Sequence, residues 1–162
     1  MSSPDSGPAE IEITEALWAG RAEDWDALRA AAHVLAEEIV FAAWAGGEVV
    51  GTTTVDGEER PVNQMPYAVY SEPVRNVLEC LGALGLFVAF DWVHWEGLLR
   101  YRDNPSELET APVSDAVRIL VAVQRSERFV DGSIEGALES GLIQTALARI
   151  IDWFTEERLA SD

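Results

Sequence analysis

Residues 115–128, DAVRILVAVQRSER, decide the fold class of this chain. Their apolar side chains recur at the three- and four-residue intervals of one helical face, and Ser114 precedes them as a candidate N-cap. Two more helical patterns follow. Ser133 can cap the first of them, which ends before Gly141, and the second has an apolar stripe made of Ile143, Ala146, Leu147, Ile150, Ile151 and Phe154. The last third of the chain is therefore predicted to be helical.

Two further helices are predicted upstream. Residues 23–47, EDWDALRAAAHVLAEEIVFAAWAGG, begin with acidic side chains, which favour a helix start, and end in two glycines, which favour a helix stop. Residues 72–85 form the other pattern, with Ser71 as a candidate N-cap. The apolar stripes consist of Trp25, Leu28, Ala32, Leu35, Ile39 and Ala42 in the first helix and of Val74, Val77, Leu78, Leu81 and Leu84 in the second.

The segment between these helices has the pattern of strands. Val49–Val55 is rich in β-branched residues and leads into Asp56-Gly57, a dipeptide that suits a two-residue hairpin turn. Pro61 cannot donate to a ladder, which places its strand at a sheet edge. Residues 66–70, PYAVY, alternate as another short strand. The predicted fold class is α+β, predominantly α-helical, with a small antiparallel β-sheet or hairpin.

The length of 162 residues suits one domain, since a chain of this size buries about two thirds of its unfolded surface. We expect residues 1–10 to form a flexible leader and residues 11–162 a single globular domain. The longest apolar run, residues 81–90, is too short to cross a bilayer, and the N-terminus lacks the basic and apolar parts of a signal peptide. A cytoplasmic location is therefore expected. The lone Cys80 is expected to be a small buried hydrophobe.

The charge of the chain is strongly negative. It has 29 acidic residues, 11 arginines and no lysine, which gives a net charge of −18. Such a surface is repelled by phosphate backbones and anionic lipids, so neither nucleic acid nor a membrane is an expected partner. A basic protein partner is expected instead, and a homodimer completed through an apolar helix stripe remains open. The alternative explanation of the acidity is solubility together with the codon bias of a GC-rich genome.

The hexapeptide FDWVHW, residues 90–95, concentrates residues that can take part in chemistry. On a helix, Asp91 and His94 would share a face, and they would be the catalytic pair if the protein is an enzyme. Trp92 and Trp95 are candidate ligand-binding residues of a pocket there. The alternative, which we favour, is that the tryptophans fill interior space and Asp91 caps a helix, because aromatic pairs at helical spacing usually bury area.

Arginines of the last third form a second candidate site. Arg118 and Arg125 lie seven residues apart and Arg128 three beyond, next to the expected helix start at Ser133, so an anion can be bound there. Arg125 and Arg128 are accordingly candidate ligand-binding residues. The alternative, again favoured, is that carboxylates already neutralise the arginines in a structural network made of Asp115, Glu127, Asp131, Glu135 and Glu139.

Metal and cofactor sites are not predicted. His33 and Glu37 have the i, i+4 spacing of metal ligands, but a solvated helix face explains them more simply. Without lysine, a P-loop and Schiff-base chemistry are both excluded.

The pattern from Pro66 to Ile151 resembles an uncharacterised bacterial and phage family known only as a domain of unknown function. The residues that carry the resemblance are Phe90-Asp91-Trp92, Trp95, Arg125, Arg128-Phe129, Gly132, Glu139 and Gly141. The resemblance implies a shared fold and transfers no catalytic role. The first 60 residues lie outside it, so the first long helix and the hairpin are interpreted as specialisations of this chain.

Two functions follow from these observations. The first is a small acidic cytosolic protein that binds a basic partner as an inhibitor or regulator, in phage–host conflict or as a nucleic-acid mimic. The second is an enzyme or small-ligand-binding domain with a pocket at Asp91, Trp92, His94 and Trp95. A concave site on which these groups converge would favour the second.

Overall fold

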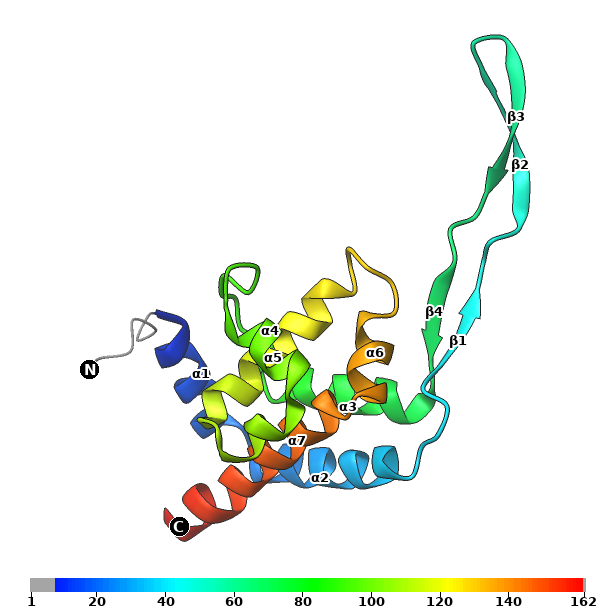
Figure 1. Cartoon of the computed structure of the whole chain (residues 1–162). Coiled ribbons are helices and arrows are strands. Elements are labelled where there is room, and N and C mark those ends of the chain that lie inside the picture. Colours follow the sequence, from blue (N-terminus) through cyan, green and yellow to red (C-terminus); the bar gives the residue numbers. More distant parts are fainter. Residues whose placement is uncertain (1–7, 162) are drawn as a thin grey trace.

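A computed structural model of the protein describes residues 8–161. A helical body carries a long two-stranded projection (Figure 1). The helices of the body are α1 (Pro8–Ala19), α2 (Ala22–Ala36), α3 (Glu72–Ala83), α4 (Gly97–Asp103), α5 (Val113–Ser126), α6 (Ser133–Glu139) and α7 (Leu142–Trp153). A 3₁₀ turn over Pro105–Thr110 precedes α5, and a π turn over Phe154–Arg158 and a 3₁₀ turn over Leu159–Ser161 follow α7.

Helix α5 runs through the centre of the body. Nearly every residue from Ser114 to Val123 is buried, as expected for a helix that other elements surround on all sides. It contacts α1, α4, α6 and α7, while α2 packs on α3 and also touches α7. One cluster of buried apolar side chains links all seven helices. The N-cap of the helix is Pro112, two residues before Ser114, the cap that the sequence predicts.

An aromatic group closes the body where α2 meets the end of the chain. The ring of Trp25 stacks on Phe154 at 4.8 Å between centroids, and Trp153 lies 5.8 Å from the same indole. The carbonyl oxygen of Gly20 accepts a hydrogen bond from the guanidinium of Arg158, which holds the α1–α2 turn against the final π turn. These contacts fix the N-terminal and C-terminal parts of the body to each other.

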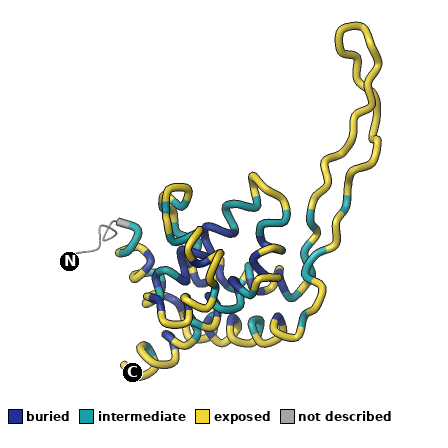
Figure 2. The backbone as a smooth tube through the Cα atoms, in the orientation of Figure 1, coloured by how far each residue is buried: buried dark blue, intermediate teal, exposed yellow. Residues whose placement is uncertain are grey.

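The projection, here called the β-arm, comprises residues 42–70. Near the body, β1 (Ala42–Ala45) pairs antiparallel with β4 (Tyr67–Tyr70), and farther out β2 (Val49–Val55) pairs antiparallel with β3 (Glu58–Asn63). The tip is the Asp56-Gly57 turn, in which both residues have positive φ, 51° and 81°, as a type I′ turn requires. Figure 2 shows the outer part of the β-arm exposed along its whole length.

The two ladders of the β-arm are separated by an irregular step. Gly46 and Gly47 both have positive φ, and a Cβ on Gly46 would lie 2.5 Å from the carbonyl oxygen of Met65. The Gly47 amide donates to the carbonyl of Gln64 at 2.6 Å, so the chain stays paired across the step. Only glycine allows this close approach, which explains the glycine pair at this point of the sequence.

The fold class is confirmed: the protein is α+β and mainly helical, with small antiparallel two-stranded sheets. The hairpin at Asp56-Gly57, the strand at residues 67–70 and the helices α3, α6 and α7 lie where the sequence predicts them. The helix expected through residue 47 is wrong beyond Ala36, because residues 42–45 pair with β4 instead. Residues 86–90 form an extended crossing segment without ladder pairing, which was one of the two expectations for them.

Residues 1–7 of the expected leader lie outside the described residues, and Pro8–Glu10 belong to α1. No helix within residues 8–161 has the length and apolar character needed to cross a membrane. Cys80, expected to be buried, is only half-buried.

Candidate functional site

The FDWVHW segment is a surface loop between α3 and α4. His94 Nδ1 lies 2.8 Å from Asp91 Oδ2, but the side chains are 82% and 71% exposed. Helix α4 begins at Gly97 with Glu96 as its N-cap, so the expectation that Asp91 caps a helix is wrong. The pair is close enough to exchange a proton, yet it stands in solvent, where nothing dehydrates or confines a substrate.

The two tryptophans of this loop face different surroundings. Trp95 packs towards the core, with its ring 5.8 Å from Phe90 and 6.1 Å from Tyr101. Trp92 instead lies beside Phe129, at 6.2 Å between ring centroids and 35° between ring planes. Both indoles are half-buried, but of the two only Trp95 packs against the apolar core. The expectation of an interior role therefore holds for Trp95 and is wrong for Trp92.

A cleft of about 370 Å³ opens on the side of Trp92. We call it the arginine cleft. The crossing segment 88–92 forms one wall and the C-terminal end of α5 with the turn after it forms the other; the lining residues are Val88, Ala89, Phe90, Trp92, Val121, Arg125, Arg128 and Phe129. Three predicted ligand-binding residues, Trp92, Arg125 and Arg128, thus come together, while Trp95 and the Asp91–His94 pair are absent from the lining.

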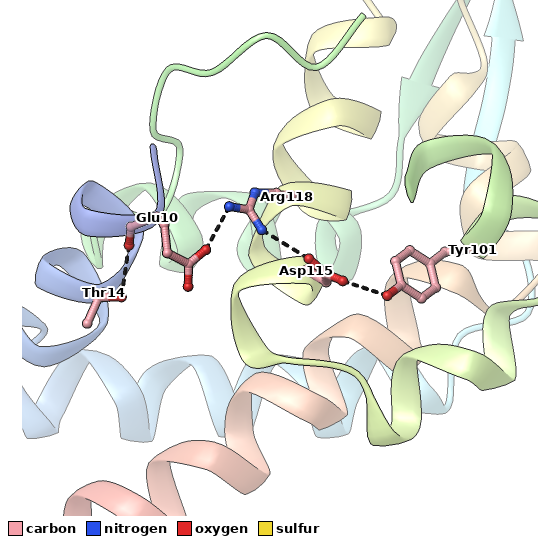
Figure 3. Close-up of polar contacts among 5 residues, drawn as sticks. All are labelled: Glu10, Thr14, Tyr101, Asp115 and Arg118. Carbon is pink, nitrogen blue, oxygen red and sulfur yellow. Dashed lines mark hydrogen bonds and ion pairs between the residues drawn. The ribbon is translucent and has the colours of Figure 1, made fainter. Parts of the chain in front are cut away.

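The three arginines singled out in the sequence have different roles. Arg118 is buried and joins two carboxylates, at 2.6 Å to Glu10 Oε2 and 3.0 Å to Asp115 Oδ1 (Figure 3). For this arginine the structural network is confirmed. Arg125 and Arg128 have no carboxylate within ion-pair distance in the part of the chain that the structure describes. For them that network does not exist.

Glu127, the carboxylate between these two arginines in sequence, points elsewhere. Its oxygens accept hydrogen bonds from the amides of Gly132 and Ile134, both at 2.8 Å. The start of α6 was expected to offer free N–H groups to an anion. The structure shows that a carboxylate of the chain itself already binds them, so the anion site cannot lie there.

Tyr70 and Trp44 attach the β-arm to the end of α5 and the start of α6. The Tyr70 hydroxyl donates to Glu127 Oε1 at 2.8 Å, and Trp44 Nε1 donates to Glu135 Oε1 at 3.1 Å. Burial and the bond to Glu127 raise the pKa of the Tyr70 hydroxyl above its ordinary range. Sequence reasoning missed both residues, because only the antiparallel pairing of β1 with β4 brings them to α6.

The β-arm exposes many apolar side chains along its length: Trp44, Val49, Val50, Val55, Val62, Met65, Tyr67 and Val69. Its outer strands differ in chemistry. Strand β2, VVGTTTV, is uncharged and has six β-branched residues out of seven, whereas β3, EERPVN, contains three charges and Pro61. The two edges of the outer ladder therefore offer a partner different surfaces: an uncharged β-branched edge at β2, and a charged edge interrupted by proline at β3.

A second cleft, of about 330 Å³, lies between α2 and α3. Small and apolar side chains dominate its lining, which consists of Ala27, Ala30, Ala31, Val34, Pro73, Asn76, Glu79 and Cys80. It lacks converging charged groups, so it offers no comparable polar recognition. Within residues 8–161 no three His, Cys, Asp or Glu side chains are grouped to hold a metal ion.

Comparison with known proteins gives one match. The model of the Family of unknown function (DUF6508) matches residues 21–156. No curated protein and no solved structure matches. The matched range includes α2 and the β-arm, so both belong to the family pattern, and the interpretation of them as specialisations of this chain is wrong.

Proposed function

Since this chain belongs to the DUF6508 family, whose function is unknown, we propose a function from its own surface: it is a small acidic cytosolic protein that binds a basic protein partner through its β-arm, as an inhibitor or regulator. The observation that carries this proposal is the β-arm itself. All residues of β2 and β3 are exposed, and neither strand rests on the helical body.

A free two-stranded ladder is a weak structure. An isolated hairpin in water is marginally stable at best, because it lacks a third layer against which to bury its side chains. Here the exposed valines of β2 and β3 gain nothing from the body. A partner that covers them would bury apolar surface at about 25 cal/mol per Å² and stabilise the ladder at the same time. Binding and ordering of the β-arm therefore support each other.

The edges of the outer ladder indicate how the partner binds. Natural edge strands are usually protected by charges and proline, as β3 is by Glu58, Arg60 and Pro61. Strand β2 has no such protection, and its unpaired N–H and C=O groups can accept an extended segment as a third strand. We therefore place the partner along β2.

Charge selects the chemistry of that partner. A net charge of −18 attracts basic proteins and repels a second copy of the same chain. The β-arm contributes Glu48, Asp56, Glu58 and Glu59 against the single Arg60, so the attraction extends to the binding strands. Electrostatic steering speeds such an encounter and is weakened by salt.

The test is affinity capture with wild type, two variants and a matched control variant. The first variant has residues 47–64 replaced by Asn-Gly, which removes β2 and β3. In the second, Glu48, Glu58 and Glu59 are changed to Gln, with a matched control that neutralises the exposed Glu15, Glu156 and Glu157 of the body. Retained proteins are identified at low and at moderate salt.

Proteins that wild type captures specifically should have high isoelectric points. They should be lost when the β-arm is shortened. The amount captured should fall more when the glutamates of the β-arm are neutralised than when those of the body are. If the shortened form retains the same proteins, the β-arm is not the binding element. Light scattering of purified protein distinguishes self-association. If wild type is a dimer and the form with the shortened β-arm is a monomer, the partner of the β-arm is a second copy of this chain and not a basic protein.

A further inference from the structure

We propose that the arginine cleft binds a small aromatic phosphate, with Arg125 and Arg128 on the phosphate and Trp92 and Phe129 against the ring. A nucleoside monophosphate is the representative of this chemical class. The site is separate from the β-arm surface and needs no protein partner. Three features of the cleft support it: the charge balance of the lining, the fixed position of Glu127, and the aromatic pair of half-buried Trp92 and exposed Phe129.

The charge balance inside the cleft is opposite to that of the whole chain. Arg125 and Arg128 both line it, and no acidic side chain does. Neither guanidinium has a carboxylate partner within the described residues, whereas elsewhere in this protein the chain supplies carboxylates to arginines, as at Arg21, Arg100 and Arg118. A dianionic phosphate would neutralise both positive charges and can accept hydrogen bonds from guanidinium groups.

Glu127 cannot take the place of that anion. Its two oxygens accept from Gly132, Ile134 and Tyr70, all at 2.8 Å. Turning it towards the cleft would break these three bonds and leave the start of α6 without an acceptor. The positive charge of the cleft is therefore a fixed feature of the fold.

The aromatic rings supply the second half of the site. Phe129 stands 78% exposed on the turn after α5, and Trp92 lies half-buried beside it. Leaving a phenylalanine ring in water is unfavourable, and a planar ring stacked on it would bury apolar surface. The rings lie too close together to admit a ligand between them, so the ligand ring stacks on their outer faces. With six apolar or aromatic lining residues beside two charged ones, the cleft resembles small-ligand sites in composition as well as volume.

The negative charge of the rest of the protein does not prevent this binding. At physiological ionic strength the screening length is about 8 Å, so the approaching phosphate responds mainly to the groups around the cleft. The remote carboxylates lower the association rate, while the contacts inside the cleft decide which anion stays bound.

The experiment is calorimetric titration of the full chain with four probes: AMP, phenyl phosphate, inorganic phosphate and adenosine. AMP carries ring and phosphate together, and the other probes lack the nucleoside, the ring or the phosphate. We expect AMP to bind at least about tenfold more tightly than inorganic phosphate or adenosine, since charged hydrogen bonds and stacking each contribute to it. The backbone amide NMR signals of Trp92 and Phe129 and the indole signal of Trp92 should shift during the titration.

Variants locate the site. Arg125→Gln and Arg128→Gln should each weaken AMP binding about tenfold, the loss expected for a charge-assisted hydrogen bond, and Phe129→Ala should weaken AMP but not inorganic phosphate. The matched controls are Arg75→Gln and Arg102→Gln, which remove exposed arginines outside the cleft lining. They should leave binding unchanged, and NMR spectra of all variants report folding.

Three outcomes would overturn the proposal: no probe binds, the control arginines matter as much as the cleft arginines, or AMP and inorganic phosphate bind alike. If phenyl phosphate binds more tightly than AMP, the ligand class is still an aromatic phosphate, but its representative is a phenolic phosphate ester and not a nucleotide. The shortened β-arm should bind AMP as wild type does, which separates this test from that of the proposed function.

Discussion

The guanidinium of Arg118 lies buried between α1, α4 and α5. It donates to Glu10 and to Asp115, and the second oxygen of Asp115 accepts from the Tyr101 hydroxyl at 2.6 Å (Figure 3). Removing one member of such a group leaves the others desolvated without their partner. We expect Arg118→Leu to lower the free energy of unfolding by about 3 kcal/mol, measured by urea denaturation.

The matched control for Arg118 is Arg102→Leu. Arg102 is exposed on α4 and makes no ion pair or hydrogen bond within the described residues, so its loss should change the free energy of unfolding by less than about 0.5 kcal/mol. If the two substitutions lower the free energy of unfolding equally, the buried position of Arg118 does not increase its contribution to stability.

The hydrogen bond between Tyr101 and Asp115 makes the stability of the protein depend on pH in the alkaline range. Burial and the hydrogen bond to Asp115 raise the pKa of Tyr101 to about 12, from 10.0 for a free phenol. Between these values the unfolded chain binds fewer protons than the folded one, so the free energy of unfolding falls as pH rises above about 10. Tyr101→Phe should make this fall shallower in denaturation curves recorded from pH 9 to pH 12.

Tyr70 also has a raised pKa and contributes to the same alkaline loss, so Tyr70→Phe is the comparison. Each single variant should remove part of the slope. If the Tyr101 variant keeps the full wild-type slope, the phenol is not held in its neutral form by Asp115.

At the residue scale the sequence could name Trp92, Arg125 and Arg128, because tryptophans and basic side chains are scarce in this acidic chain. It could not tell which arginines are neutralised. That depends on Glu127, whose side chain is directed away by the amides of α6 and by Tyr70, 57 residues distant in sequence. Side-chain direction of this kind is set by tertiary contacts and has no local signal.

Among the elements, the β-arm is the most independent. It joins the body through β1 and β4, whereas β2 and β3 pair with each other and project away from the helices (Figure 1). Replacing residues 47–64 by Asn-Gly should therefore leave the melting temperature of the body within about 2 °C of wild type, because it removes no buried contact. Thermal unfolding followed by circular dichroism at 222 nm checks this.

Destabilisation by more than about 1 kcal/mol would mean that β2 or β3 supports the body, against their full exposure. The comparison variant is Gly132→Ala, at the base of the β-arm. There φ is +90°, and a Cβ would lie 2.8 Å from the indole of Trp44, so this single methyl group should destabilise more than removal of the outer ladder.

The incorrect prediction of a helix over residues 37–45 shows the limit of predicting structure from hydrophobic periodicity. Ile39 and Ala42 continue the helical spacing of the stripe, yet AAWA pairs with YAVY, and the Ser71 amide donates to the Phe41 carbonyl at 2.9 Å. Tertiary pairing overrides a weak local preference. The Asp56-Gly57 turn was predictable because a two-residue hairpin turn places both residues at positive φ, and Asp-Gly is one of the dipeptides favoured there.

For the whole molecule, the surplus of carboxylates is the dominant electrostatic property. A net charge of −18 on 162 residues destabilises the compact state through mutual repulsion, and salt screens that repulsion. Raising sodium chloride from about 10 mM to about 150 mM should therefore raise the melting temperature by about 3 °C, the shift that about 1 kcal/mol gives a domain of this size. Differential scanning calorimetry measures it.

Choline chloride at equal ionic strength is the control, since it screens charge without a metal cation. Equal shifts in the two salts support screening. A melting temperature that stays constant or falls with salt would show that attractive ion pairs, not repulsion, dominate the surface.

The global arrangement was the least predictable part. Composition and periodicity predict a mainly helical protein with a hairpin, but they do not show that the strands leave the body as a projection rather than covering it. The outer ladder follows the step at Gly46 and Gly47, and the direction that the chain takes there has no signal in the periodicity of the sequence. The arginine cleft depends on where the crossing segment 88–92 meets α5.

The projecting β-arm also determines how the protein responds to proteases. Exposed hairpin tips are usually nicked first. Between Arg29 and Arg75, however, the sequence contains one arginine and no lysine. That arginine, Arg60, is followed by Pro61, and trypsin cleaves an Arg–Pro bond poorly. Trypsin should therefore leave the projection intact, while a glutamate-specific protease should cut beside Glu58 and Glu59. Digestion with the two enzymes in parallel thus offers a footprint for anything that covers the tip.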